Sequence, residues 1–183
     1  MFKIETTRVK GDAWKARDAA EDFVKSQGPY DEIGSGSYAT VYGANDSDVV
    51  YKVGLLLDNE GYLSYLEELR KMKQHNPFTP RIYEFRKYRA TNTGKGGPGA
   101  FVVAMERLRA DSRVEEDPLA AWFMIEIMDQ EGTFLDRWPT QHELEVINIL
   151  QDAERRCMEA EWDLHSENFM YRGDQIVITD PLG

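Results

Sequence analysis

The sequence has one cysteine, Cys157, and three histidines in 183 residues. A single cysteine excludes an internal disulfide and is typical of a reducing compartment. His75, His142 and His165 lie far apart and lack cysteine partners, which disfavours a structural zinc site. No apolar run approaches the roughly 18 residues of a membrane span, and the N-terminus lacks the apolar core of a signal peptide. We therefore expect a soluble, cytoplasmic protein with no membrane partner.

Positive charge is also scarce, with 22 Lys and Arg against 33 Asp and Glu and a net charge of −11. Because phosphate-rich partners are bound through Lys and Arg, this balance disfavours nucleic acid as a partner. Any anionic ligand must instead be held by local positive groups. The apolar fraction of 42% is that of a globular chain. The length suits one domain or two small lobes.

The N-terminal residues 1–28 predict a packing extension. Residues 1–10 alternate like a short edge strand. Asp12 is a plausible N-cap for a helix through about Lys25, and Gly28-Pro29 would end this part. The candidate buried positions of the helix are Trp14, Ala20, Phe23 and Val24.

A glycine-rich stretch follows at residues 33–43. Gly34 and Gly36, two apart and followed by β-branched and aromatic residues, predict a hairpin whose turn brings backbone N–H groups close to phosphates. The next strand, residues 49–53, carries Lys52 among apolar residues. Lys52 is either an edge-strand charge that discourages aggregation or a fixed cation for phosphate oxygens.

Residues 59–74 predict a helix with Tyr62, Leu66 and Leu69 on one stripe. Glu60 and Glu67 are seven residues apart and point to nearly the same side. Either could pair with Lys52, or both are surface charges. Strands are expected at 81–88 and 100–105, joined by a flexible loop at 91–99.

The segment 110–117 is polar and predicts a linker. Asp117-Pro118 then supplies an N-cap and a first-turn proline for a helix at 119–129, apolar nearly all round and therefore buried or partner-binding. Thr140 and Glu143 form a capping box that opens a helix to about Ala160, with His142 at the surface. Its expected buried stripe is Val146, Ile149, Ala153 and Cys157, with Leu150 close by.

The C-terminal residues 161–183 predict a loop, a short strand, a turn at Gly173-Asp174 and a second strand ending on an acid. This hairpin brings Asp163, Asn168 and Asp180 near one another. Asp163 could orient or deprotonate a hydroxyl, and Asn168 with Asp180 could give oxygen ligands to Mg²⁺. Taken alone, the stretch also fits a polar turn between two strands.

In this order, the glycine-rich hairpin, strand lysine, helix glutamate and Asp/Asn/Asp hairpin resemble the protein-kinase-like superfamily, including the aminoglycoside and choline phosphotransferase branch. Trp-Asp-Leu-His-x-x-Asn-x-Met at 162–170 and Thr-Asp-Pro-Leu at 179–182 are most similar to the small kinases of lytic bacteriophages. The resemblance covers about residues 30–183. It implies an α+β fold, with an antiparallel-sheet N-lobe (29–107) containing one main helix and a truncated, mainly helical C-lobe (108–183) that carries a catalytic β-hairpin.

The resemblance also implies the nucleotide-binding residues. Gly34 and Gly36, with the backbone of Ser37, would cover the phosphates of ATP, and Val41 would touch the adenine. Lys52 would bind the α and β phosphates. Lys52 would itself be held by Glu67, with Glu60 as the second choice. Glu106 to Leu108 would form the hinge whose backbone binds adenine, and Met105 or Ala104 would border the pocket.

Asp163 would be the catalytic base, and Asn168 and Asp180 would ligate Mg²⁺. His165 could contact the γ-phosphate, or it is a loop histidine hydrogen-bonded to backbone. The chain departs from the family at three places. Ala39 replaces the third glycine of the loop. Glu161-Trp162 replaces the usual His-Arg, so control by a phosphorylated activation loop is not expected. Pro181-Leu182-Gly183 replaces Phe-Gly.

From the resemblance, we expect residues 1–183 to hold no counterpart of the family's peptide-docking surface. An apolar surface left uncovered would favour a homo-oligomer or a covering partner. We expect an ATP- and Mg²⁺-dependent kinase that phosphorylates a protein Ser or Thr, its own or a host's if it is phage-encoded and acts in the host cytoplasm. Its own candidate acceptors are Ser35, Ser37, Tyr38 and Thr40. A small hydroxyl compound is the second choice of acceptor. The alternative is a pseudokinase-like binding module that binds nucleotide or a host protein, and inhibits it without phosphoryl transfer.

Overall fold

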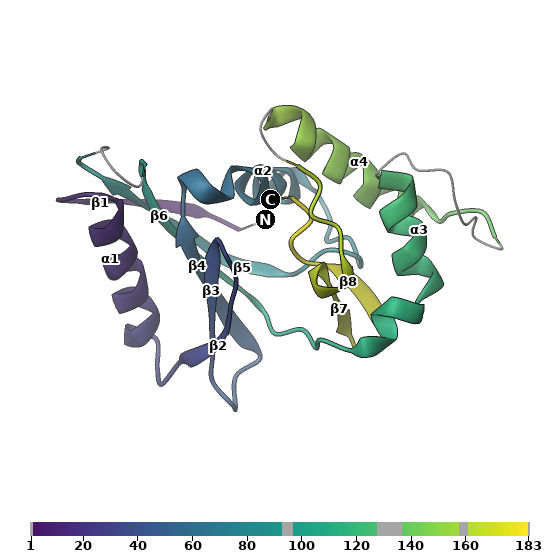
Figure 1. The fold of residues 1–183 in the computed structure, drawn as a ribbon, viewed down its shortest axis with the longest axis horizontal. Helices are drawn as coiled ribbons and strands as arrows, with labels where there is room; N and C mark the ends of the chain where they lie inside the picture. Colours follow the sequence, from purple (N-terminus) through teal and green to yellow (C-terminus); the bar gives the residue numbers. More distant parts are fainter. Residues whose placement is uncertain (1, 93–96, 128–136, 158–160, 183) are drawn as a thin grey trace. The chain divides into compact units, whose positions relative to one another are not determined.

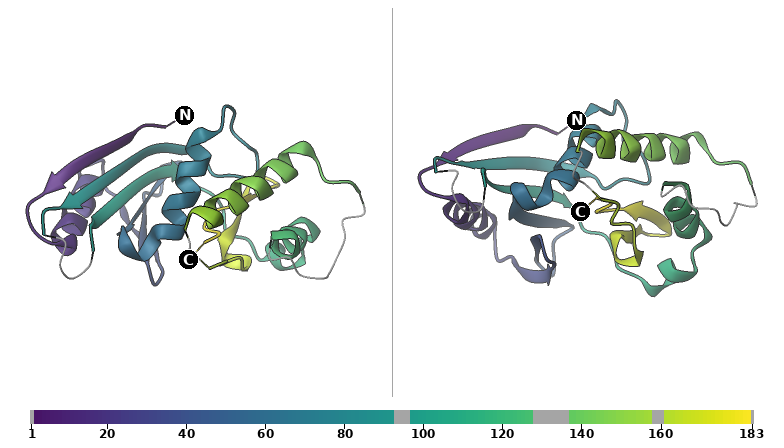
Figure 2. Two further views of the ribbon diagram at one scale, coloured as in Figure 1. Left: turned by 90° about the horizontal axis from the view of Figure 1, so that it is seen from above. Right: turned by 45° about the horizontal axis from the view of Figure 1, so that its top comes forward.

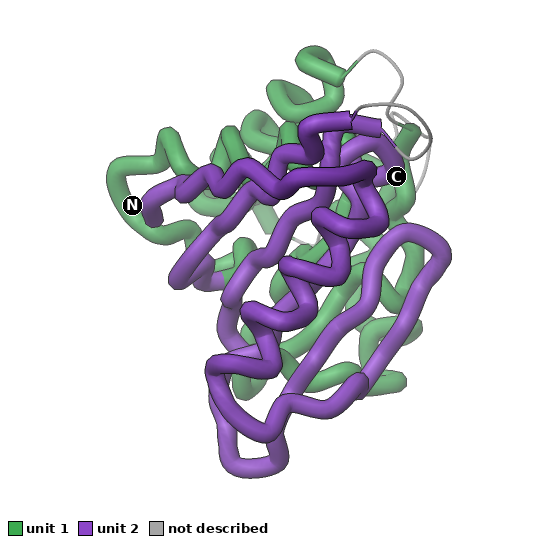
Figure 3. The backbone as a smooth tube through the Cα atoms, turned by 90° about the vertical axis from the view of Figure 1, so that its left-hand side faces the viewer, with its two compact units in different colours: residues 1, 60–80, 108–183 green, residues 2–59, 81–107 purple. Residues whose placement is uncertain are grey.

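The computed structural model describes residues 2–92, 97–127, 137–157 and 161–182. The chain divides into two compact units (Figure 3). Residues 2–59 and 81–107 form one, here called the sheet unit, and residues 60–80 and 108–183 form the other, the helical unit. The fold is mixed α/β (Figure 1). None of the helices in the described ranges has the length and apolar character needed to span a bilayer.

The sheet unit is built on six strands in the order β1-β5-β6-β4-β3-β2. Strands β2 to β6 pair antiparallel, whereas β1 pairs parallel with β5 at the edge. The expected strands at 1–10, 49–53, 81–88 and 100–105 are thereby confirmed. Their bounds are β1 Ile4–Val9, β2 Asp31–Ser35, β3 Ala39–Gly43, β4 Val49–Leu55, β5 Ile82–Ala90 and β6 Gly99–Glu106.

Helix α1 (Ala13–Ser26) packs on this sheet. Asp12 caps it by accepting a hydrogen bond from Lys15 N at 3.0 Å, as expected. Its buried stripe has the three-to-four residue spacing of one helix face. The expectation for Trp14 was wrong, because this side chain points off that face and is 53% exposed. The stripe is made of small residues, which let the helix approach the sheet closely: Ala13, Ala16, Ala20 and Val24.

The helical unit contains three helices and one hairpin among its described residues. Helix α4 packs against both α2 and α3, and α2 and α4 lie side by side in Figure 2. The hairpin turns at Gly173, whose φ of 62° suits glycine, as expected. The bounds are α2 Glu60–Lys71, α3 Pro118–Ile127, α4 Gln141–Arg156, β7 Phe169–Arg172 and β8 Gln175–Ile178. Short 3₁₀ turns are η1 Leu57–Asn59 in the sheet unit, and η2 Ser112–Glu116 and η3 Ser166–Asn168 here.

The helix starts of this unit follow from local capping. Asp117 Oδ1 accepts from Leu119 N at 2.9 Å, and Thr140 and Glu143 form the expected capping box. The expected linker 110–117 instead contains η2, which Asp111 caps through Arg113 N at 3.0 Å. The predicted ends of α3 at 128–129 and of α4 at 158–160 lie outside the described residues.

The buried stripe of α4 differs in part from the expectation. Val146, Leu150 and Ala153 are buried as predicted, and Ile147 joins them. The expected core positions Ile149 and Cys157 are half-buried. Cys157 is the C-cap of α4 and has an extended backbone. Its side chain therefore does not continue the buried stripe of the helix.

Two glutamates of the helical unit are buried, which charged residues rarely are without partners. Glu68 is 7% exposed and pairs with Lys71 Nζ at 2.6 Å and with Arg156. Glu143 is 1% exposed and forms a two-bond ion pair with Arg137. Neither burial was predicted from the sequence.

Candidate active site

Asp163 and Asn168 lie together at the start of the hairpin in the helical unit. The side-chain Nδ2 of Asn168 donates to the backbone carbonyl of Asp163 at 2.5 Å and to its carboxylate Oδ2 at 3.2 Å. The five-residue spacing closes through η3, in which Asn168 N donates to His165 O at 2.9 Å. Asn168 is buried, whereas the Asp163 carboxylate is 46% exposed and open to a substrate.

Asp180 is held in the same place by its neighbours in the chain. Thr179 donates to Asn168 O twice, from its backbone N at 2.9 Å and from Oγ1 at 3.0 Å. Asp163 N donates to Pro181 O at 3.0 Å. The hydrogen bonds therefore run in a closed ring from Asp163 to Asn168, on to Thr179, through Asp180 to Pro181, and back to Asp163. The structure thus brings the backbone at Asp180 close to Asp163 and Asn168.

Two buried tyrosines of α2 lie near Asp180. Burial raises the pKa of Tyr62 and of Tyr65, and the negative charge of Asp180 raises both further. Both phenols are therefore neutral at physiological pH. Tyr65 Oη donates to the Ile178 carbonyl at 2.9 Å, two residues before Asp180. Sequence reasoning missed Tyr65 and Thr179, since neither belongs to a motif and the contact of Tyr65 is to backbone.

His165 adopts the backbone-bonded arrangement that was one of its two predicted roles. Its Nδ1 accepts from Glu167 N at 3.3 Å and caps η3. This bond assigns the ring proton to Nε2, which lies 3.3 Å from Asp163 Oδ1 and can donate to it. Asn168 Nδ2, 3.1 Å from Nε2, is itself a donor and makes no hydrogen bond to this tautomer. His165 can thus orient the Asp163 carboxylate. Its side chain is 48% exposed.

The donor set fits a hard divalent cation. The Nδ2 side of the Asn168 amide faces the two Asp163 oxygens. The Asn168 Oδ1, on the opposite side of the same amide, therefore points away from Asp163. An amide oxygen from Asn168 and a carboxylate from Asp180 are the ligand types that Mg²⁺ takes, with water and phosphate oxygens in its remaining positions. Within the described ranges, no three His, Cys, Asp or Glu side chains cluster to hold a metal by themselves. An ion that shares its ligands with a substrate would not need such a cluster.

The glycine-rich hairpin lies in the sheet unit, at its free edge. Strands β2 and β3 enclose the turn, which Gly36 N closes by donating to Ala39 O at 2.9 Å. Neither glycine has a positive φ. A Cβ at Gly34 would meet nothing within 4 Å, and one at Gly36 would meet only Ala39 O at 4.0 Å. Neither backbone conformation nor packing within the chain requires glycine there.

Of the hydroxyl residues proposed as acceptors in this hairpin, Ser35, Ser37 and Tyr38 are exposed. Thr40 is 4% exposed and its hydroxyl bonds to Arg17 Nη2 at 3.0 Å. The structure therefore removes Thr40 from the candidate acceptors.

Lys52 lies on β4, an interior strand between β3 and β6, in register with Val41 on one side and Val103 on the other. The edge-strand interpretation of Lys52 was therefore wrong. The side chain is buried, at 6% exposure, where a lysine needs a functional or electrostatic reason. Of the two α2 glutamates considered for it, Glu67 is half-buried and Glu60 is exposed.

The predicted hinge, 106–108, contains the point in the sequence where the sheet unit ends and the helical unit resumes. Glu106 Oε1 accepts from Arg81 N at 2.7 Å, and Glu106 N donates to Arg81 O at 3.0 Å. Arg107 N donates to Asp48 O at 2.7 Å. The N–H groups of Glu106 and Arg107 are therefore engaged within the sheet unit, and Leu108 already belongs to the helical unit.

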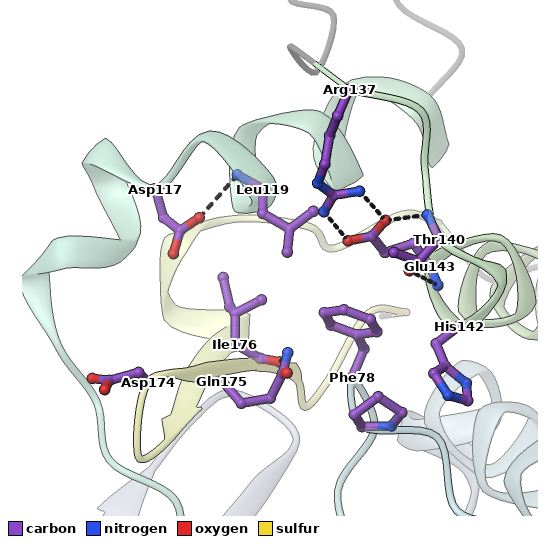
Figure 4. Close-up of a pocket in the computed structure, with 11 residues that line it drawn as sticks. Phe78, Asp117, Leu119, Arg137, Thr140, His142, Glu143, Asp174, Gln175 and Ile176 are labelled. Carbon is purple, nitrogen blue, oxygen red and sulfur yellow. Dashed lines mark hydrogen bonds and ion pairs between the residues drawn. The ribbon is translucent and has the colours of Figure 1, made fainter.

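A separate pocket of about 400 Å³ opens in the helical unit (Figure 4). Its apolar floor comes from Phe78, Leu119 and Ile176, and the Arg137–Glu143 pair forms one wall. None of the predicted site residues lines it. The remaining lining residues are Pro77, Asp117, Thr140, His142, Asp174 and Gln175.

The sequence matches no protein-family model and no curated protein. Among solved structures it is similar to a crystal structure of Rad53 1–466 in complex with AMP-PNP, at 18% sequence identity and a TM-score of 0.42. The match covers 89% of this chain and 42% of that chain, so this chain spans less than half of the other. Similarity at this level says nothing of this chain's activity.

Proposed function

We propose that the chain is an ATP- and Mg²⁺-dependent phosphotransferase that transfers the γ-phosphate to a protein Ser or Thr hydroxyl. The observation that carries the proposal is the closed ring of hydrogen bonds through Asp163, Asn168 and the backbone on both sides of Asp180. A polar turn between two strands needs no such ring. Phosphoryl transfer depends mainly on positioning and electrostatic stabilisation, which this arrangement supplies.

In this proposal Asp163 orients the acceptor hydroxyl and accepts its proton. Its carboxylate is half-exposed, so an acceptor can reach it, and Asn168 and His165 fix its direction. Asn168 Oδ1 and the Asp180 carboxylate hold Mg²⁺, whose charge would offset that of the phosphates.

Lys52 is the proposed cation for the α and β phosphates. A chain with a net charge of −11 repels polyphosphate at long range, so a fixed local cation is needed. Burial of Lys52 on an interior strand keeps its ammonium in place. Glu67, half-buried on α2, is its proposed partner.

The glycine-rich hairpin would cover the phosphates with the backbone of Gly34, Gly36 and Ser37. The open space where a Cβ would stand supports this, since a close ligand is then the remaining reason for glycine. Val41 would border the adenine. Leu108 is the proposed hinge N–H donor, since the preceding two N–H groups are engaged.

Radiolabel transfer tests the proposal directly. Full-length protein is incubated with γ-labelled ATP and Mg²⁺, alone and with a bacterial lysate. Asp163→Asn and Asp180→Asn keep side-chain size and should abolish labelling. Asp174→Asn, at the 98% exposed hairpin turn, removes the same charge and should label like wild type. Label on Ser35 or Ser37 would identify self-phosphorylation.

The second candidate, a binding module without phosphoryl transfer, predicts a different outcome. ATP would then raise the melting temperature of the protein while no label appears under any condition. Equal labelling by wild type and both site variants would also refute the proposed chemistry.

A further inference from the structure

The end of strand β8 is held from outside the hairpin at both of its backbone groups. The Ile178 carbonyl accepts from Tyr65 Oη at 2.9 Å, and Ile178 N donates to Phe78 O at 2.9 Å. Both partners come from residues 60–80, the segment that contains α2. The Tyr65 side chain is completely buried, so water does not compete for this bond.

The hydrogen bonds continue from Ile178 to the candidate site. The next residue, Thr179, bonds to Asn168 O, and Pro181 O accepts from Asp163 N. Asp180 lies between these two fixed points. The Tyr65 hydroxyl is therefore the first link in a series that ends at the proposed metal ligand.

Helix α2 is also fixed on its other side, to α4. Ser64 Oγ donates to the Ala153 carbonyl at 2.7 Å, one residue before Tyr65. Buried Glu68 pairs with Arg156, the last residue of α4. These contacts lie entirely within the helical unit, so they hold α2 whatever the sheet unit does.

We propose that Tyr65 is a positioning residue that couples α2 to Asp180. Its hydroxyl holds the segment 178–181 against α2, so that Glu67 on α2 and the metal ligand Asp180 form one preassembled body. The site then requires no activating movement of α2 relative to Asp180. The regulatory meaning of this coupling rests on the proposed function; the coupling itself does not.

The test compares two variants that each remove one hydroxyl donor from α2. Tyr65→Phe removes the bond to Ile178, and Ser64→Ala removes the bond to Ala153. The first readout is the Mg²⁺ concentration for half-maximal phosphate incorporation. We expect Tyr65→Phe to raise it about tenfold, the effect of one buried hydrogen bond, and Ser64→Ala to leave it unchanged.

The second readout needs no activity. Backbone amide hydrogen exchange is followed at Asp163 and Thr179, whose N–H groups close the ring. Tyr65→Phe should speed exchange at both by about tenfold, whereas Ser64→Ala should not. Equal effects of the two variants on the exchange rates would overturn the proposal, because Tyr65 would then contribute only general stability.

The two readouts separate the coupling from the enzyme activity. If wild type transfers no phosphate but Tyr65→Phe alone speeds exchange at Asp163 and Thr179, the proposed function fails and the coupling stands. If Tyr65→Phe does not fold, exchange in wild type decides. The amides of Ile178 and Thr179 should then open together with those of α2 in mild denaturant, and independent opening would overturn the coupling.

Discussion

Asn168 Nδ2 donates to two oxygens of Asp163, the backbone carbonyl at 2.5 Å and the carboxylate Oδ2 at 3.2 Å. One amide group thereby fixes both the main chain and the side chain of the proposed base. The same two bonds fix the orientation of the Asn168 amide, so that its Oδ1 is left to bind a metal. Two residues that resemble separate functional positions in the sequence act as one unit in the structure.

Replacing Asn168 by Asp should uncouple this pair. A carboxylate there cannot donate either bond, and it brings a second negative charge within hydrogen-bond distance of Asp163. Repulsion between the two carboxylates turns the Asp163 side chain away from the direction that Asn168 gives it. We expect phosphate transfer to fall about 100-fold or more, the scale of general base catalysis. The measurement compares the phosphate-transfer rates of Asn168→Asp and Asn45→Asp. Asn45 is exposed in a turn, so Asn45→Asp controls for the added charge. Similar rates in both would contradict this role.

Alanine at Gly34 and Gly36 should separate ligand binding from stability. Because no atom crowds either position, we expect the free energy of unfolding of the double variant to lie within about 1 kcal/mol of that of wild type. ATP binding, measured by titration calorimetry, should weaken about tenfold or more as the methyl groups displace phosphate from the backbone. Gly54→Ala is the control, because its Cβ would lie 2.8 Å from Phe101 Cε1 and should destabilise the sheet. Unchanged ATP affinity in the double variant would remove the hairpin from the nucleotide site.

The three glutamates of α2 predict three different outcomes. Glu67→Gln should reduce phosphate transfer about tenfold or more with little change in melting, if Glu67 holds Lys52. Glu60→Gln, at an exposed position, should change neither. Glu68→Gln should destabilise the fold by about 1–3 kcal/mol, because Lys71 and Arg156 lose a buried partner. Loss of transfer in Glu60→Gln alone would reverse the assignment.

Acid should destabilise the protein through Glu143. The hydrogen bonds from Arg137, helped by Thr140 N, lower the pKa of Glu143 from 4.5 to about 2. The folded state thus binds a proton less readily than the unfolded state. The stabilisation is complete above the unfolded pKa near 4.5 and is lost as the pH falls from there through 2.

Glu143→Gln keeps the capping box but removes this titration, so its melting temperature should fall less between pH 5 and pH 2 than that of wild type. Melting curves over this pH range measure the difference. Glu145→Gln, on the same helix and partly exposed, should keep the wild-type acid dependence. An unchanged slope in Glu143→Gln would show that the ion pair with Arg137 does not titrate as expected.

Local features were readable from the sequence because they depend on neighbours in the chain. The capping groups of Asp12, Asp117 and Thr140 act within three residues, and the turn at Gly173 needs one positive φ. Alternation along strands and stripes along helices follow from backbone geometry. The closeness of Asp163 and Asn168 was likewise predictable, since one short turn spans their separation.

Contacts between distant segments were not readable. The stripe of α1 was placed partly on Trp14, because apolar character indicates burial but not which face of a helix meets the sheet; the small residues at Ala13 and Ala16 decide that. The burial of Glu68 depends on Arg156, which comes from another helix.

By itself, the sequence determined the strands, the helix starts and the order of the residues proposed to handle phosphate. Tertiary structure alone decided that Lys52 lies on an interior strand, and that Tyr65 bonds to a carbonyl 113 residues away. The physical reason is that every backbone carbonyl is chemically alike. The packing of the elements decides which carbonyl a buried hydroxyl reaches. The residue type at position 178 therefore gives no indication of the bond from Tyr65.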